Sequence, residues 1–144
     1  MVAAWYYNDD GEDQRLTHQF TPNQEVSIEE LAALGVDYWN VKGEEDPQLK
    51  ELREKYNYSY HDYITISRET LPDYENRIKT FFIEHIHDDD EIRFGLDGGG
   101  YFDIRGKDDR WIRIEFGKDD MISIPAGIYH RFTLNENNYA KGKI

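Results

Sequence analysis

The chain has 144 residues, of which 38% are hydrophobic and 15% aromatic, which is enough apolar surface for the core of one domain. Its 30 acidic residues outnumber its 17 lysines and arginines, and this net charge of -13 opposes binding to a phosphate backbone, so we expect no nucleic-acid partner. The lack of cysteine excludes disulfide bonds and thiolate ligands, and no apolar run reaches the about 20 residues of a membrane span. We therefore expect a soluble intracellular protein without membrane insertion.

The first half of the chain is predicted to consist mainly of helices and loops. Ser27–Glu30 forms a capping box, which predicts a helix that ends near Gly35. Asp46-Pro47 predicts the start of a second helix, and Leu71-Pro72 the start of a third. Between these two helices, residues 60–66 are rich in β-branched and aromatic side chains, which predicts a strand.

The second half of the chain has the period of two that is typical of strands. Residues 91–96 and 101–105 alternate on either side of Asp97-Gly98-Gly99-Gly100, which predicts a hairpin. Three further short strands are predicted over residues 111–114, 121–124 and 130–133. This pattern predicts a mainly β fold with a helical N-terminal part, in which the strands form an antiparallel barrel or jelly-roll sandwich. We expect a single domain over residues 1–144, helical and looped over 1–80 and barrel-forming over 81–144.

Two histidines one residue apart stand just before the first of these strands. In an extended strand His85 and His87 share a face, and Glu91 and Arg93 keep the same parity. The alternate positions of this stretch are apolar, so we expect both faces to be buried. Buried imidazoles and charged groups need a partner, and a divalent metal ion is one.

A third imidazole strengthens the prediction of a metal site. His130 follows the turn Pro125-Ala126-Gly127, which would deliver it to the mouth of a barrel. Three histidines and one carboxylate suit iron(II), nickel(II), manganese(II) or zinc(II). Asp90 is an alternative to Glu91 as the carboxylate, and polar packing or a surface pair is the alternative to a metal for His85 and His87.

Two other features have simpler explanations. His18 and His61 have no partners at metal spacing, so structural or surface roles are expected for them. The glycines at 98–100 precede a strand rather than a helix, so a phosphate-binding loop is not expected there.

Taken together, these motifs resemble the acireductone dioxygenase family, whose members are small cupins of the methionine salvage pathway. The resemblance begins with H-x-H-x-x-x-E-I-R and covers nearly the whole chain. The matching segments are His85–Arg93, Leu96–Arg105, Trp111–Ile114 and Pro125–Thr133 in the second half, and Ala4–Tyr6, Leu34–Trp39 and Asn57–Tyr60 in the first. The resemblance implies a cupin-type barrel and an oxidoreductase that incorporates dioxygen.

The resemblance also implies a ligand set and a reaction. His85, His87, Glu91 and His130 would bind one Fe(2+) or Ni(2+) per chain. The substrates would be acireductone, which is 1,2-dihydroxy-3-keto-5-methylthiopentene, and dioxygen. The iron form would yield formate and 4-methylthio-2-oxobutanoate, and the nickel form would yield formate, carbon monoxide and 3-methylthiopropanoate.

Further residues and partners follow from the same resemblance. Arg93 would stabilise negative charge on the substrate, and a salt bridge to a neighbouring acid is an equally weighted alternative for it. Phe81 and Phe132 match aromatics that flank the substrate, although core packing is the stronger expectation for both. The family also implies a monomer, a location in the cytoplasm and also the nucleus, and, for some relatives, binding to the cytoplasmic tail of a membrane protease.

The chain departs from the family pattern in three respects: at Gly95, at two loop glycines, and at its C-terminal end. Gly95 stands where relatives carry a larger aliphatic residue, which predicts a looser pocket, and Gly99 and Gly106 replace polar loop residues. Relatives continue past Ile144 with a strand that begins near Lys141 and closes the barrel, so the last strand is expected to be missing here. Two alternatives therefore stay open: a truncated, non-catalytic cupin that acts as a binding or regulatory partner, and a zinc hydrolase or isomerase with Glu91 as its base.

Overall fold

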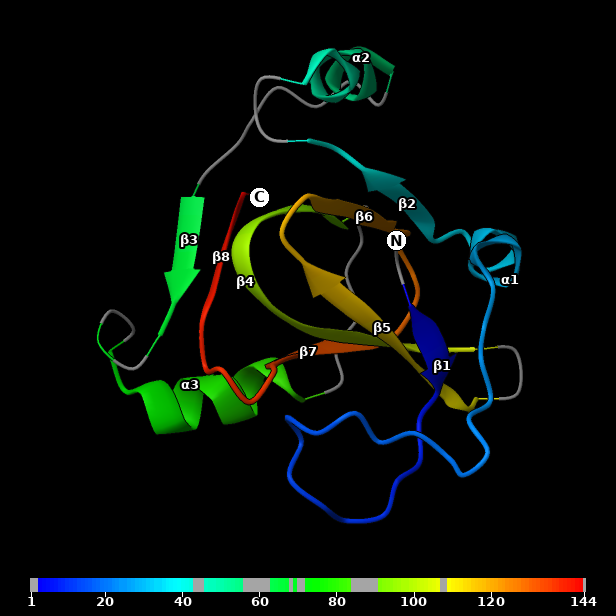
Figure 1. The fold of residues 1–144 in the computed structure, drawn as a ribbon, viewed down its shortest axis with the longest axis vertical. Helices are drawn as coiled ribbons and strands as arrows, with labels where there is room; N and C mark the ends of the chain where they lie inside the picture. Colours follow the sequence, from blue (N-terminus) through cyan, green and yellow to red (C-terminus); the bar gives the residue numbers. More distant parts are fainter. Residues whose placement is uncertain are drawn as a thin grey trace.

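The computed structural model describes residues 3–42, 46–55, 63–67, 69, 72–83, 91–106 and 109–143. Within these residues, eight strands form one curved sheet around a shared interior, and three short helices lie outside it (Figure 1). The strands are β1 (Ala4–Tyr6), β2 (Asp37–Asn40), β3 (Tyr63–Ile66), β4 (Glu91–Arg105), β5 (Trp111–Gly117), β6 (Asp120–Ile124), β7 (His130–Leu134) and β8 (Ala140–Lys143). The helices are α1 (Ile28–Ala33), α2 (Pro47–Lys55) and α3 (Tyr74–Phe81). In the part of the chain that these ranges cover, no helix has the length and apolar character to cross a membrane.

The three predicted helices are present. Ser27 Oγ accepts a hydrogen bond from the Glu30 backbone N–H at 3.1 Å, as the capping box predicts. Asp46 accepts one from the Gln48 N–H at 2.9 Å and so satisfies a free donor of the first turn of α2. The third helix begins three residues later than Leu71-Pro72 predicts, at Tyr74.

The predicted hairpin at residues 97–100 is wrong, because β4 runs unbroken from Glu91 to Arg105. The first half of β4 pairs with β6 and β8, and its second half pairs with β5 and β7. The glycines allow other backbones to approach this strand closely. A Cβ atom would lie 2.2 Å from the Tyr139 carbonyl oxygen at Gly98 and 2.2 Å from the Thr133 carbonyl oxygen at Gly100.

Three strands come from the first half of the chain. Within the predicted strand at residues 60–66, residues 63–66 form β3, which pairs with β8, and residues 60–62 lie outside the described residues. The strands β1 and β2 were not predicted, and they extend the sheet by pairing with β5 and β6. With three and four residues, they are too short to show a clear period of two.

The expectation that a strand near Lys141 is missing is corrected by β8. This strand lies between β3 and β4, with Ala140 opposite Ile66 and Lys143 opposite Phe94. Figure 1 shows it as the red segment beside β4. Both of its edges are paired, so β8 covers the edge of β4 that would otherwise be open.

The main core lies on the inner face of the curved sheet. It includes buried side chains from β4, β5 and β6, namely Phe102, Ile104, Ile112, Ile114, Ile122 and Ile124, together with Leu31 and Val36 from α1 and its C-terminal side. Opposite strands supply matching pairs, since Ile104 faces Ile112 and Phe102 faces Ile114. Full burial of each such side chain contributes about 1.5 to 3 kcal/mol, so this face holds the strands in the register that positions the site.

Candidate active site

His130 is the first residue of β7, and the structure orients its imidazole ring. The side chain is buried in the same face as Ile104, its partner on β4. Its Nδ1 lies 3.1 Å from the Ile128 carbonyl oxygen. Because a carbonyl oxygen only accepts hydrogen bonds, this contact requires a proton on Nδ1, and in the neutral tautomer with that proton the lone pair is on Nε2. A lone pair held in a fixed direction is what a metal ligand requires, so His130 fits a divalent metal ion.

The first residues of β4 pair with β6. A single turn of the chain joins the end of β6 to His130 at the start of β7. Glu91 is paired with Ile124, and Arg93 with Ile122. Directly opposite residues of an antiparallel pair share a sheet face, so Arg93 lies on the face of Ile122, which belongs to the main core. Arg93 is half-buried, and its NH1 donates a hydrogen bond to the Ile92 carbonyl oxygen at 3.1 Å.

A tight turn joins the end of β6 to the start of β7. Gly127 in this turn has a φ of 82°, a conformation that favours glycine. The turn also packs on the end of α1, where a Cβ at Gly35 would lie 3.0 Å from Pro125 Cγ. The structure therefore brings His130 and the start of β4 to connected parts of the same barrel wall.

His85, His87 and the alternative ligand Asp90 lie outside the described residues, in the segment between α3 and β4. Over the described ranges alone, no group of three or more histidine, aspartate or glutamate side chains is arranged to hold a metal ion.

Phe81 and Phe132 pack in the same cluster. Phe132 lies opposite Phe102, with ring centroids 4.9 Å apart and ring planes at 52°. Phe81, at the end of α3, packs with Phe132 against the buried Leu134 and Ile66. Both phenylalanines are half-buried, and Phe132 also borders the main core.

The structure leaves no added space at Gly95. A Cβ atom at this position would lie 2.0 Å from the Gly117 carbonyl oxygen and 3.4 Å from Phe116 Cε1. The backbone of β5 therefore occupies the place that a side chain of residue 95 would take. This glycine permits a close approach of two strands and does not open a pocket where the sequence pattern predicts one.

A buried ionic cluster behind His130 was not predicted. We call it the Asp103 cluster, and it consists of Asp103, Arg113 and Arg131 on the outer face of β4, β5 and β7. Arg113 donates from Nε and NH2 to the two carboxylate oxygens of Asp103 at 2.8 and 2.9 Å. Arg131 donates from Nε to the same carboxylate at 2.8 Å. The sequence signal that could have predicted this cluster is the presence of charged residues at the outward-facing positions of otherwise apolar strands.

Aromatic rings and the N-terminal loop cover the Asp103 cluster. Arg113 NH1 donates to the Gln14 and Leu16 carbonyl oxygens at 2.8 and 2.5 Å. Tyr7 also lies against the cluster, with its ring centroid 4.6 Å from Arg113 Cζ. Burial raises the pKa of Tyr7, although the two guanidinium groups oppose this shift. The cluster is therefore shielded from water.

His18 has a structural role in this loop, as expected. Its ring is buried and stacks on Tyr7 with centroids 4.5 Å apart. Its two ring nitrogens lie 2.9 and 2.7 Å from the carbonyl oxygens of Asn8 and Asp13. His61 lies outside the described residues.

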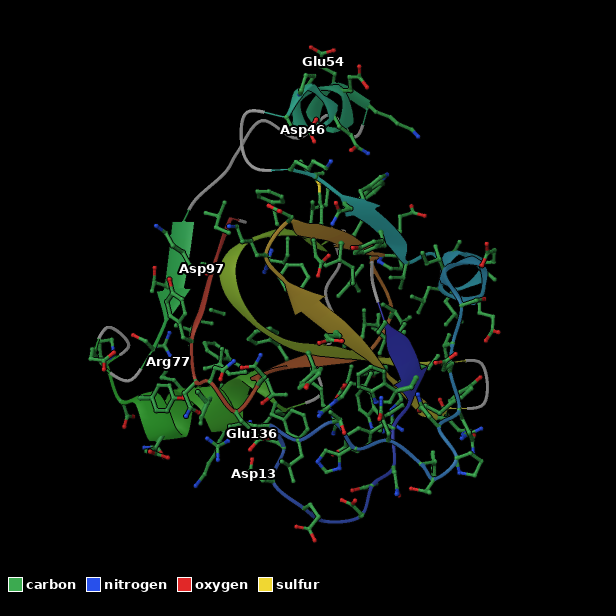
Figure 2. The ribbon with its side chains drawn as sticks, in the orientation of Figure 1. Asp13, Asp46, Glu54, Arg77, Asp97 and Glu136 are labelled. Carbon is green, nitrogen blue, oxygen red and sulfur yellow. The ribbon has the colours of Figure 1, made fainter. Side chains whose placement is uncertain are left out.

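Most other charged side chains lie at the surface. Figure 2 shows six of them around the outside of the barrel: Asp13, Asp46, Glu54, Arg77, Asp97 and Glu136. All of these except the half-buried Asp46 are exposed. The large negative charge is therefore carried mainly outside the barrel.

Comparisons with known proteins agree on one family. The model of the ARD/ARD' family matches residues 3–142. The acireductone dioxygenase of Gallus gallus is 58% identical and that of Homo sapiens 53% identical, each over 98% of this chain and 80% of the relative. A solved structure of acireductone dioxygenase from Bacillus anthracis, with a cadmium ion in its active center, has a TM-score of 0.77 at 23% identity and covers 99% of this chain and 91% of that one. The structural match confirms the cupin-type fold.

Proposed function

This chain belongs to the acireductone dioxygenase family, and on that premise we propose that it cleaves acireductone with dioxygen in methionine salvage. The observation that carries the proposal is the 58% identity over 98% of the chain to an acireductone dioxygenase. No observation favours the non-catalytic cupin or the zinc hydrolase over a dioxygenase.

The proposed metal ligands are His85, His87, Glu91 and His130, and the proposed ion is one Fe(2+) or Ni(2+) per chain. Two observations support this set: the buried His130 presents an Nε2 lone pair, and Glu91 is paired with Ile124 in the strand that leads to His130. When bound, such an ion acts as a Lewis acid and as a template for the substrate enediolate and dioxygen. The iron form would release formate and 4-methylthio-2-oxobutanoate, and the nickel form formate, carbon monoxide and 3-methylthiopropanoate.

Three other side chains have proposed roles around the substrate. Arg93 stabilises the negative charge that develops on the substrate oxygens, since it lies on the inward face of β4. Phe81 and Phe132 line the place of the apolar methylthio tail and keep water from it, since both are half-buried in one cluster. We further propose that the protein is a monomer in the cytoplasm and nucleus, and that it binds a membrane protease's cytoplasmic tail.

Separate reconstitution with each metal tests the proposed function. Apo-protein is loaded with iron(II) or nickel(II), and acireductone loss in air is followed together with the release of formate and carbon monoxide. We expect both loaded forms to accelerate acireductone loss beyond free metal, with carbon monoxide only from the nickel form. If neither form exceeds free metal, the proposal fails, and hydrolysis or isomerisation by a zinc-loaded sample alone would favour the zinc enzyme.

A further inference from the structure

We propose that the contact between Arg131 and Phe82 positions the metal ligands and so sets the affinity for the metal. This inference rests on the proposed function, because it takes His85, His87 and His130 to be ligands. Arg131 follows His130 directly, and Phe82 stands three residues before His85. The contact therefore joins the two stretches of chain that carry all three histidines.

The contact is close and shielded from water. Arg131 Cζ lies 3.9 Å from the centroid of the Phe82 ring and 4.2 Å from that of Trp111. Only 14% of the Arg131 side chain is exposed. A guanidinium that contacts ring faces is attracted by their π electrons, and this attraction is strongest where water is excluded.

Hydrogen bonding within the Asp103 cluster fixes the position of the Arg131 guanidinium. Its Nε donates to Asp103, which is 1% exposed and also accepts two hydrogen bonds from the fully buried Arg113. The planar guanidinium makes this hydrogen bond and the ring contact together, which an ammonium group cannot do in the same geometry.

The position of Arg131 is linked to that of His130 through the strand. Successive residues of a strand point to opposite faces, so His130 points into the barrel while Arg131 points to the outer face. His130 and Arg131 are paired in register with Ile104 and Asp103. A shift of the guanidinium away from Asp103 would therefore act on the first residues of β7, where the imidazole is held.

Phe82 is linked to the other two histidines by a short length of chain. Figure 1 shows the end of α3 beside β7, and Phe82 follows its last residue. Phe82 precedes His85 by three residues and His87 by five, so at most about 11 Å of chain separates the contact from the first histidine and about 18 Å from the second. Phe81 packs separately in the cluster with Leu134, so α3 stays anchored when the Phe82 ring is removed.

A double-mutant cycle on the apo-protein tests the inference. The variants are Phe82→Leu, Arg131→Lys and their combination, with Phe82→Tyr as the conservative change that keeps the ring. The readouts are the nickel(II) dissociation constant from calorimetry and the Tm of the apo-protein from circular dichroism. We expect each of the first two substitutions to weaken nickel binding by about tenfold or more, which is the usual effect of losing a group that orients a ligand.

Two further results are expected from the same cycle. The double variant should bind nickel no more weakly than whichever single variant has the lower nickel affinity. Both substitutions remove the same contact, so their effects should not add. Phe82→Tyr should keep the wild-type dissociation constant, because the ring face is retained.

The pair Tyr6 and Arg110 is the matched control. Arg110 Cζ also lies 3.9 Å from the Tyr6 ring centroid, but this more exposed contact is remote in sequence from the three histidines. We expect Tyr6→Leu and Arg110→Lys to leave nickel affinity unchanged.

The overturning outcomes are distinct. If Phe82→Leu lowers the Tm but not the nickel affinity, the contact is only structural and the inference is wrong, while the proposed function stands. Wild-type protein that does not bind nickel overturns the proposed function, and the inference with it. If Arg131→Lys fails to fold, Phe82→Leu and Phe82→Tyr decide the question.

Discussion

The two faces of the sheet formed by β4, β5 and β7 differ in what they contribute. Where β4 pairs with β5 and β7, the inner face carries apolar side chains and one imidazole, His130. The outer face carries the Asp103 cluster, whose three charged groups are joined by hydrogen bonds. Alternation along the same strands thus separates a proposed metal ligand from the ionic cluster behind it. This difference predicts that loss of Asp103 mainly affects folding and that loss of His130 mainly affects metal binding.

The largest effect on stability is expected from the outer face. Replacing Asp103 by Ala leaves Arg113 and Arg131 buried without their carboxylate, and removing one partner of a buried ion pair costs about 3 to 5 kcal/mol. The free energy of unfolding is measured by urea denaturation of the apo-protein. The exposed Asp9→Ala is the control, for which a change within about 0.5 kcal/mol is expected. A similarly small change for Asp103→Ala would show that the cluster adds little to stability.

Stabilisation by added metal should show the opposite dependence, because it should depend on His130 on the inner face. Nickel(II) at one hundred times its dissociation constant should stabilise the wild-type protein by about 2.7 kcal/mol, and chelation should remove this gain. His130→Ala should lose most of it, because the variant lacks one proposed ligand, while its apo-protein keeps its secondary structure. Thermal unfolding with and without nickel measures the effect. Equal stabilisation of wild type and variant would contradict the ligand role of His130.

A smaller effect is expected from packing around His130. Ile104→Val removes one methylene group opposite the imidazole and should lower the free energy of unfolding by about 0.5 to 1.5 kcal/mol. Nickel affinity should stay unchanged, because the Nδ1 hydrogen bond to Ile128 does not involve this side chain. Calorimetry and urea denaturation of the same sample measure both quantities. A loss of nickel affinity would show that apolar packing also orients the ring.

Local motifs made the family, the helices and most strands of the second half predictable from the sequence. The capping box at Ser27 is an example, because its signal lies within four residues. The hairpin at residues 97–100 was wrong because glycine signals both turns and close approach, and only the positions of Tyr139 and Thr133 distinguish the two. The Asp103 cluster joins residues from three strands, so its pairing depends on the strand register.

Features of the candidate site that depend on contacts with other parts of the chain were likewise not predictable from the sequence. The sequence pattern singles out His130 as an imidazole but does not say which nitrogen carries the proton. That assignment needs the Ile128 carbonyl oxygen 3.1 Å away. The effect of Gly95 was likewise hidden, because the carbonyl that fills its space belongs to Gly117 on another strand.

The smallest predicted effect tests the loop that covers the outer face. The hydrogen bonds from Arg15 lower the pKa of Asp13 from its usual 3.8 to about 2. As the pH falls, the unfolded chain takes up this proton first, so the pair stabilises the fold fully above about pH 4 and loses its effect as the pH falls toward 2. Asp13 is 43% exposed, so solvent limits the contribution to at most about 1 kcal/mol.

Asp13→Asn should therefore cost up to about 1 kcal/mol at pH 6, with the difference from wild type shrinking between pH 4 and 2. Urea denaturation of both proteins at each pH measures it. The exposed Asp9→Asn controls for the loss of one negative charge from the same loop. A difference that stays constant over this pH range would mean that Asp13 acts through its backbone geometry, and not through its ion pair with Arg15. The loop would then be attached to the outer face mainly by the hydrogen bonds from Arg113 to the Gln14 and Leu16 carbonyl oxygens.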